Sequence, residues 1–193
     1  MLERVVEEHL FTVEEFAKML RADVLDADKK FELIEGKLFE MTAMESPHFA
    51  TVMRLNYLFV ERLGKRAQTS VQSPIRLSER SAPEPDLALL RPRQDFYATQ
   101  IPTANDALLL VEVAFSSYQR DKTIKLPLYA KHGVAETWLV DLNAKRIEAH
   151  REPKDGVYRQ TLIFDETQNI APMNFPDIAF SVAEILGAKP MSL

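Results

Sequence analysis

The chain has 193 residues, of which 46% are hydrophobic and 27% are charged, so it can bury the core of one large domain without disulfides. It contains no cysteine, which excludes disulfides, zinc–thiolate sites and cysteine nucleophiles. The formal net charge of −5 counts against a protein that coats nucleic acid by charge alone, but an enzyme that gathers carboxylates around a metal ion remains compatible with it.

The chain shows no sign of a membrane or an export signal. No stretch reaches the roughly 18 to 20 apolar residues that a membrane span requires. The acidic segment MLERVVEEHLFTVEEF at the N-terminus lacks the apolar core of a signal peptide. The sequence therefore predicts a cytoplasmic protein without membrane contact. A single domain is expected over residues 1–193, with an N-terminal helix and hairpin (about 12–41) packed on its core.

The first predicted elements are a short helix and a hairpin. Thr12 followed by Glu15 is a capping-box pattern that opens a helix through about Leu20. The segment FELIEGKLFEM alternates between apolar and polar residues around a glycine. It predicts a β-hairpin in which Phe31–Glu35 pairs with Lys37–Met41.

A longer, half-buried helix follows. Ser46 is expected as its N-cap and Pro47 at its first helical position, and Gly64 marks its end. Apolar residues recur at helical spacing along it, namely Phe49, Val52, Leu55, Phe59 and Leu63.

The middle of the chain predicts strands. TSVQSPIRL is typical of one or two short strands, and LALLR, directly after Asp86, of another. Residues 91–107 are polar and contain two prolines, which indicates a surface loop. LLLVEVAF, residues 108–115, is apolar on both faces, as expected for a central strand that is covered on both sides.

The remaining elements complete a mixed α/β fold. Ser117 can cap a helix that runs towards His132, and Pro127 inside that helix predicts a kink or a ragged first half. ETWLVDL and KRIEAHR predict a hairpin, VYRQTLIF a further strand, and residues 181–187 a short closing helix. The order of elements predicts an α/β sheet with mixed strand directions, flanked by helices.

Glu112 is the first candidate for chemistry. It is the only charged residue in LLLVEVAF, where both faces of the strand should be dry. An unpaired buried carboxylate costs several kcal/mol at least, so Glu112 needs a metal ion or a cationic partner. A structural ion pair is the alternative interpretation.

Asp86 favours a metal ion over a structural ion pair, because it lies at the start of a neighbouring predicted strand. Two carboxylates on adjacent strands can share one hard cation through oxygen ligands, and the main-chain carbonyl of Val113 can supply a third ligand. Taken alone, Asp86 would be interpreted as a strand-entry residue that accepts hydrogen bonds from turn amides.

Lys125 is the third candidate. It lies on the helix after the Glu112 strand, and Asp121, Lys125 and Tyr129 are spaced four apart on one helical face. A lysine that overlooks the strand could hold the attacking water or neutralise developing negative charge on a phosphate. An isolated helix lysine is otherwise a solvated side chain.

The ordered set of these motifs resembles the Uma-two family of restriction-endonuclease-like proteins. The resemblance covers roughly residues 12 to 187. The matching pieces, in order, are FELIEG, His48, Pro85-Asp86, Glu112-Val113, the Asp121–Lys125–Tyr129 helix and GVAETWLVD.

The resemblance implies a PD-(D/E)XK core in which Asp86 and Glu112 chelate Mg²⁺ or Mn²⁺. The usual lysine two residues after the glutamate is replaced here by Ala114, and the family pattern implies that Lys125 substitutes for it. Many relatives carry an acidic or small polar residue where this chain has Phe115. Strand alternation places Phe115 on the face opposite Glu112, so the site is expected to survive.

Two further residues are supporting candidates. Glu32, in the family's hairpin, could reach the metal or orient a ligand, or it could pair with a basic residue at the edge of the core. His48, in the first turn of the long helix, could meet water or phosphate, or it could be a plain surface or capping histidine.

These residues predict a metal-dependent endonuclease that hydrolyses phosphodiester bonds in DNA. A homodimer is compatible with that activity, because cutting both strands calls for two sites. One alternative is an inactive module of the same fold that binds nucleic acid or a protein partner, which Ala114, Phe115 and the acidic charge favour. Another is a phosphoesterase for small nucleotides. A basic rim around the site is expected from Arg91, Arg93, Arg120, Lys122 and Lys131.

Overall fold

The computed structural model describes residues 8–41 and 45–188 of the chain. The single domain expected over residues 1–193 includes the segments 1–7, 42–44 and 189–193, which lie outside the described residues. In the described part of the chain, no helix is both long enough and apolar enough to cross a membrane.

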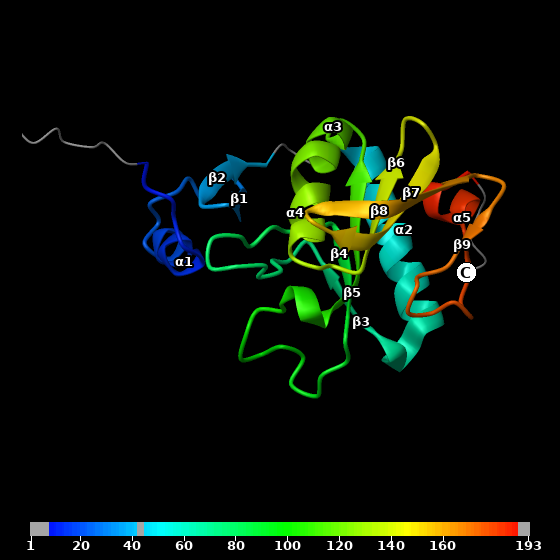
Figure 1. The fold of residues 1–193 in the computed structure, drawn as a ribbon, viewed down its shortest axis with the longest axis horizontal. Helices are drawn as coiled ribbons and strands as arrows, with labels where there is room; N and C mark the ends of the chain where they lie inside the picture. Colours follow the sequence, from blue (N-terminus) through cyan, green and yellow to red (C-terminus); the bar gives the residue numbers. More distant parts are fainter. Residues whose placement is uncertain (1–7, 42–44, 189–193) are drawn as a thin grey trace, which may run out of the picture.

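A six-stranded mixed sheet forms the centre of the protein (Figure 1). The strands lie side by side in chain order, and β5 and β6 are parallel whereas every other neighbouring pair is antiparallel. Their bounds are β3 (Gln68–Val71), β4 (Leu87–Leu90), β5 (Ala107–Ala114), β6 (Glu136–Asp141), β7 (Arg146–Lys154) and β8 (Val157–Asp165). The expected mixed α/β fold with a covered central strand is confirmed, since all eight residues of β5 are buried.

Two small antiparallel pairs accompany this sheet. The first is the predicted hairpin, with β1 (Phe31–Ile34) paired to β2 (Lys37–Glu40). The second joins β9 (Asn169–Ile170) to β10 (Phe180–Ser181), and the sequence did not predict it because each strand has only two residues.

The two N-terminal helices follow their predicted caps closely. α1 (Val13–Arg21) begins with the expected capping box between Thr12 and Glu15. α2 (Ser46–Leu63) has Glu45 at the N-cap position, so Ser46 as N-cap was wrong by one residue. Phe49 was wrongly placed in the core: it is 55% exposed, while the other apolar residues expected on the inner face of α2 are buried.

The crossover between the parallel strands contains an interrupted helix. α3 (Tyr118–Arg120) leads into a π-helical turn, η3 (Asp121–Lys125), and then into α4 (Leu126–Lys131). The main-chain N–H of Leu126 donates to the carbonyl of Asp121, five residues earlier. Proline has no N–H to continue the α-helical ladder, and the first half of this helix is irregular, which is one of the two forms expected from Pro127.

The short elements are η1 (Gly64–Arg66), η2 (Ala104–Asp106) and the closing helix α5 (Val182–Leu186). In Figure 1, α1 and the β1–β2 hairpin lie at one end of the molecule, whereas α5 lies at the other.

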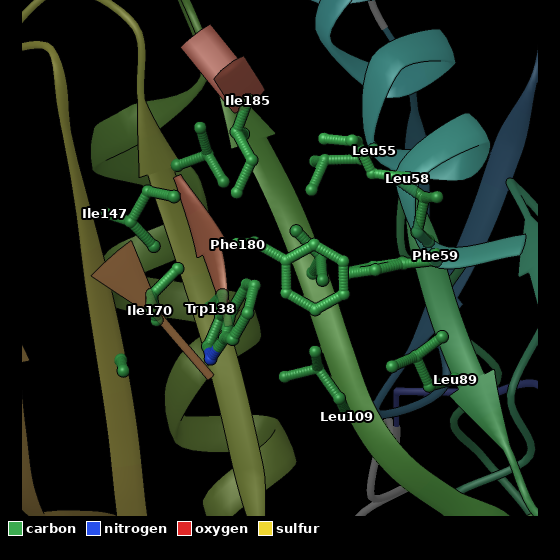
Figure 2. Packing of buried hydrophobic residues seen from close by; sticks show 14 of the residues in the cluster. Leu55, Leu58, Phe59, Leu89, Leu109, Trp138, Ile147, Ile170, Phe180 and Ile185 are labelled. Carbon is green, nitrogen blue, oxygen red and sulfur yellow. The ribbon is translucent and has the colours of Figure 1, made fainter. Parts of the chain in front are cut away.

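The main hydrophobic core fills the space between the sheet, α2 and the C-terminal segment. Figure 2 shows the Phe180 ring between side chains of α2 and those of the strands. The ring centroids of Phe59 and Phe180 are 5.2 Å apart in an edge-to-face contact, and those of Phe59 and Trp138 are 6.0 Å apart. The opposite face of the sheet packs on the interrupted helix, through side chains that include Leu110, Leu139, Leu126 and Tyr129.

Glu136 is a fully buried carboxylate at the start of β6 that has only structural partners. Its oxygens accept hydrogen bonds from the Trp138 indole at 3.0 Å and from the Met173 main chain at 2.6 Å. Arg151 is its cation, with an Nη2–Oε1 distance of 2.7 Å. The carboxylate therefore ties three parts of the fold together without contact with a cleft.

We predict that Glu136→Ala lowers the free energy of unfolding by about 3–5 kcal/mol, because it leaves Arg151 as an uncompensated, largely buried charge. Urea denaturation monitored by the fluorescence of the sole tryptophan measures the change. The matched control is Glu40→Ala, which removes an exposed ion pair with Lys29 and should change stability by less than about 1 kcal/mol. Equal effects of the two substitutions would contradict the prediction.

Candidate active site

Asp86 lies immediately before β4, where three groups bind its carboxylate. Oδ2 accepts from the Val113 main-chain N–H at 2.8 Å and lies 2.9 Å from His48 Nε2. Oδ1 has a weaker contact of 3.3 Å from the Gln72 amide. Burial works to raise the pKa of Asp86, but the hydrogen bond and charge of His48 hold it below the ordinary value. Asp86 is thus a fixed, ionised carboxylate, and its Oδ1 has only the weak contact with Gln72.

The residue before it, Pro85, cannot donate a main-chain hydrogen bond to β5. In the β4–β5 register Leu87 pairs with Val111, and continuing this register sets Asp86 opposite Glu112 and Pro85 opposite Val113. In an antiparallel pair every second pair of opposite residues exchanges N–H···O bonds, and proline has no N–H to donate at such a position. The carboxylate of Asp86 takes the N–H of Val113 instead. The Val113 carbonyl therefore receives no bond from Pro85.

Glu112 projects from β5 towards the interrupted helix. Its side chain is 2% exposed, and both oxygens have partners: Oε1 accepts from the Tyr129 hydroxyl at 2.5 Å and Oε2 from Lys125 Nζ at 3.1 Å. Burial raises the pKa of Glu112 well above the ordinary carboxyl range, and the charge of Lys125 opposes that shift. The predicted need for a cationic partner is met by Lys125.

Lys125 ends the π-helical turn and is as deeply buried as Glu112. Its ammonium contacts Glu112 Oε2 at 3.1 Å, Glu32 Oε1 at 2.9 Å and the Glu84 carbonyl at 3.1 Å. Burial works to lower the pKa of Lys125, but the carboxylates of Glu112 and Glu32 raise it above the ordinary lysine value. An ammonium group has three N–H donors, and each has an acceptor here.

Glu32, on β1, connects the N-terminal hairpin to this cluster. Its side chain is fully buried and binds Lys125 through Oε1 and Arg120 Nη2 through Oε2, the latter at 2.8 Å. Oε1 also accepts from the Glu84 main-chain N–H at 2.9 Å. Of its two expected roles, the contacts among described residues are those of a partner for basic side chains.

His48, in the first turn of α2, contacts Asp86, which lies 38 positions later in the chain. Its Nε2 binds Asp86, while its buried Nδ1 has no hydrogen-bond partner within residues 8–41 and 45–188. The imidazole is therefore part of the site, where it orients a carboxylate.

A cleft of about 440 Å³ opens over these residues. Its lining includes Asp86, Glu112, Lys125 and His48, and also residues that the sequence interpretation had not assigned to the site, namely Gln72, Glu84, Ser117 and Asp121. Asp121 is buried and accepts from the Ser117 hydroxyl at 2.6 Å. Its spacing to Lys125 was the one available signal for it.

Phe115 also lines the cleft, so its expected placement on the face opposite Glu112 was wrong. The reason is that β5 ends at Ala114, and the side-chain alternation of a strand does not continue beyond its end.

Of the five residues expected to form a basic rim, Arg120 lines the cleft. The other four candidates are engaged elsewhere. Arg93 pairs with Asp95, Lys122 with Glu148 and Lys131 with Glu35. The remaining one, Arg91, donates to the carbonyl of Asn105.

The donor set suits a hard divalent cation, although it is small. Among the described residues, no three side chains of His, Cys, Asp or Glu are grouped as metal ligands. Asp86 and Glu112 supply carboxylate oxygens and Val113 a carbonyl, which are the ligand types that Mg²⁺ prefers, with water completing its shell. Each oxygen of Glu112 already accepts one hydrogen bond, but a carboxylate has about four acceptor positions in all.

The mixed sheet, covered on both faces and carrying a carboxylate cleft, defines the class of restriction-endonuclease-like proteins. A family model matches residues 13–183, and the chain belongs to that family, Uma2, described as "Putative restriction endonuclease". The fold is similar to a crystal structure described as a putative nuclease belonging to DUF820 from Anabaena variabilis ATCC 29413. That match has a TM-score of 0.75 and 18% identity, and covers 92% of this chain and 98% of the other. No curated protein matches the chain.

We predict that Lys125→Met lowers the free energy of unfolding by about 3–5 kcal/mol, because two fully buried carboxylates lose their shared cation. Thermal and urea denaturation in the presence of a chelator measure the effect. Lys131→Met is the control, because Lys131 forms an exposed ion pair with Glu35 and its loss should change stability by less than about 1 kcal/mol. A Lys125 variant as stable as the control would show that the cluster does not need its ammonium.

Proposed function

We propose that this protein is a divalent-metal-dependent endonuclease that hydrolyses phosphodiester bonds in DNA. The observation that supports the proposal is that Asp86, directly before β4, and Glu112, on the neighbouring strand β5, line the same cleft. Membership of the family described as "Putative restriction endonuclease" supports a nuclease.

Asp86, Glu112 and the Val113 carbonyl would hold Mg²⁺ or Mn²⁺. A bound divalent ion of this kind lowers the pKa of a water ligand and polarises a phosphoryl oxygen. Two features prepare the carboxylates for this role. The first concerns Asp86: His48 and the Val113 N–H fix it through Oδ2, which leaves Oδ1 with only the 3.3 Å contact from Gln72.

The second feature concerns Glu112, which Tyr129 and Lys125 hold in place. Their hydrogen bonds keep its carboxylate in one orientation, and the ammonium of Lys125 opposes its protonation in a buried position. In this role Lys125 orients Glu112 and does not bind water or phosphate directly, although direct binding was expected from the sequence. Its three N–H donors already have acceptors in the protein.

The competing hypothesis is a module of the same fold that binds a partner without catalysis. Phe115 favours it, because this apolar side chain lines the cleft where many relatives carry an acidic or small polar residue. Metal binding separates the two hypotheses, since a module without catalysis has no need for a carboxylate-dependent cation.

We expect the wild-type protein to bind Mn²⁺, and Asp86→Asn or Glu112→Gln to weaken that affinity at least about tenfold, because each removes one of two charged ligands. Isothermal titration calorimetry measures the dissociation constants. Asp177→Asn is the matched control, because Asp177 is an exposed carboxylate bound to Arg66. Equal Mn²⁺ affinity in all four proteins would contradict the assignment of the ligands.

We further expect cleavage of supercoiled plasmid or single-stranded DNA with Mg²⁺ or Mn²⁺. The cleavage should stop with a chelator and fall at least about a hundredfold in Asp86→Asn and Glu112→Gln, because both ligands serve the same charged transition state. Gel electrophoresis of the products measures the rates, and purified Asp177→Asn should retain wild-type activity. Cleavage at one rate by all variants would indicate a contaminating nuclease. Metal binding without any cleavage would indicate a nuclease that lacks its proper substrate, whereas absence of both metal binding and cleavage would favour the non-catalytic module. Equal cutting of both duplex strands would call for two copies of the site.

A further inference from the structure

Two cations share Glu32 but differ in their access to solvent. Lys125 binds Oε1 of Glu32 and has a side chain that is 2% exposed. Arg120 binds Oε2 of the same carboxylate, and its side chain is 24% exposed. Both residues line the cleft. A substrate that enters the cleft therefore meets one cation that is enclosed and one that is open.

The enclosed cation has no donor to offer. Each N–H of Lys125 points to an acceptor of the protein, two of them carboxylates that are themselves buried. To bind a phosphate oxygen, Lys125 would have to give up one of these bonds. Leaving a buried charged group unpaired in this way costs several kcal/mol.

The open cation has donors to spare. Within the described part of the chain, the hydrogen bonds of Arg120 all come from Nη2, which donates to Glu32 and lies 3.1 Å from the Met41 sulfur. The guanidinium group carries five N–H donors in a planar fork, a geometry that matches the oxygens of a phosphate. Its carbon lies 6.0 Å from the centre of the Phe39 ring, which supports one side of the group.

The charge of the cleft makes such a cation necessary for a polyanion. Carboxylates outnumber basic side chains in the lining, with Asp28, Glu40, Glu45, Glu84, Asp86, Glu112 and Asp121 against Lys29, Lys30, Arg120 and Lys125. Lys29 is bound to Glu40, and Lys125 is enclosed. Lys30 is exposed, and Arg120 is the partly exposed cation that is joined to the buried cluster, through Glu32 and then Lys125 to Glu112.

We propose that Arg120 binds a phosphate of the nucleic-acid substrate in the cleft, and that Lys125 is a positioning residue that acts through Glu112. The assignment to a nucleic-acid phosphate rests on the proposed function. Glu32, from the N-terminal hairpin, then holds the enclosed and the open cation in fixed relation to each other.

The test is binding of a fluorescein-labelled single-stranded oligonucleotide, measured by fluorescence anisotropy with Ca²⁺ over a range of salt concentrations. Arg120→Ala should weaken binding about tenfold to a hundredfold. It should also lower the slope of log affinity against log salt by about 0.7, the contribution of one phosphate contact in a single strand. Arg120→Lys should restore the slope but only part of the affinity, because lysine lacks the planar fork.

The matched control is Arg93→Ala, because Arg93 pairs with Asp95 and does not line the cleft. The Mn²⁺ affinity of Arg120→Ala should equal that of the control, since Glu32 keeps Lys125 as its partner. Its melting temperature should fall, because Oε2 of the buried Glu32 loses its cation. Lys125→Arg, which retains the charge but not the compact ammonium, should instead weaken Mn²⁺ binding, because Lys125 positions Glu112.

The possible outcomes separate this proposal from the proposed function. Wild-type affinity and salt slope in Arg120→Ala would overturn the role of Arg120, as would a wild-type protein that binds no oligonucleotide. Absence of Mn²⁺ binding by the wild type would overturn the metal-dependent function and leave the phosphate contact standing if the salt slope still responds to Arg120.

Discussion

A single buried carboxylate, Glu112, constrains much of the architecture around the cleft. It stands in the middle of a strand whose other seven residues are all apolar and buried, so its charge needs a cation from elsewhere in the fold. The interrupted helix supplies Lys125 from a π-helical turn. An ammonium with three donors then needs further acceptors, and Glu32 of the hairpin and the Glu84 carbonyl provide them. One charge thus links three distant segments of the chain.

The Pro85-Asp86 dipeptide lies directly before β4, the strand that pairs with the Glu112 strand β5. Pro85 has no N–H to donate to the Val113 carbonyl, and the Val113 N–H donates to the side chain of Asp86. The two residues together change a regular pair of strands into a place where two carboxylates and a carbonyl can meet.

The sequence predicted the elements whose pattern is long and local. The strand expected at 108–115 is found at Ala107–Ala114, and the capping box expected from the spacing of Thr12 and Glu15 is present. The sequence could also indicate that Glu112 needs a cation. It could not show that Glu32 binds Arg120, because the two residues are 88 positions apart and their contact depends on how the hairpin packs. Phe115 was misplaced because the end of a strand is set by tertiary hydrogen bonding and not by periodicity.

Glu136 shows why burial alone does not identify a functional carboxylate. Like Glu112, it is enclosed on a strand of the central sheet and bound to a basic side chain. Its partners are an indole, a main-chain N–H and Arg151, and it does not line the cleft at Asp86. Glu112 differs because a second carboxylate lies opposite it and a cleft reaches both. A functional carboxylate is therefore distinguished by a second carboxylate next to it and by a cleft through which a ligand can reach both. Both properties depend on how the strands are paired.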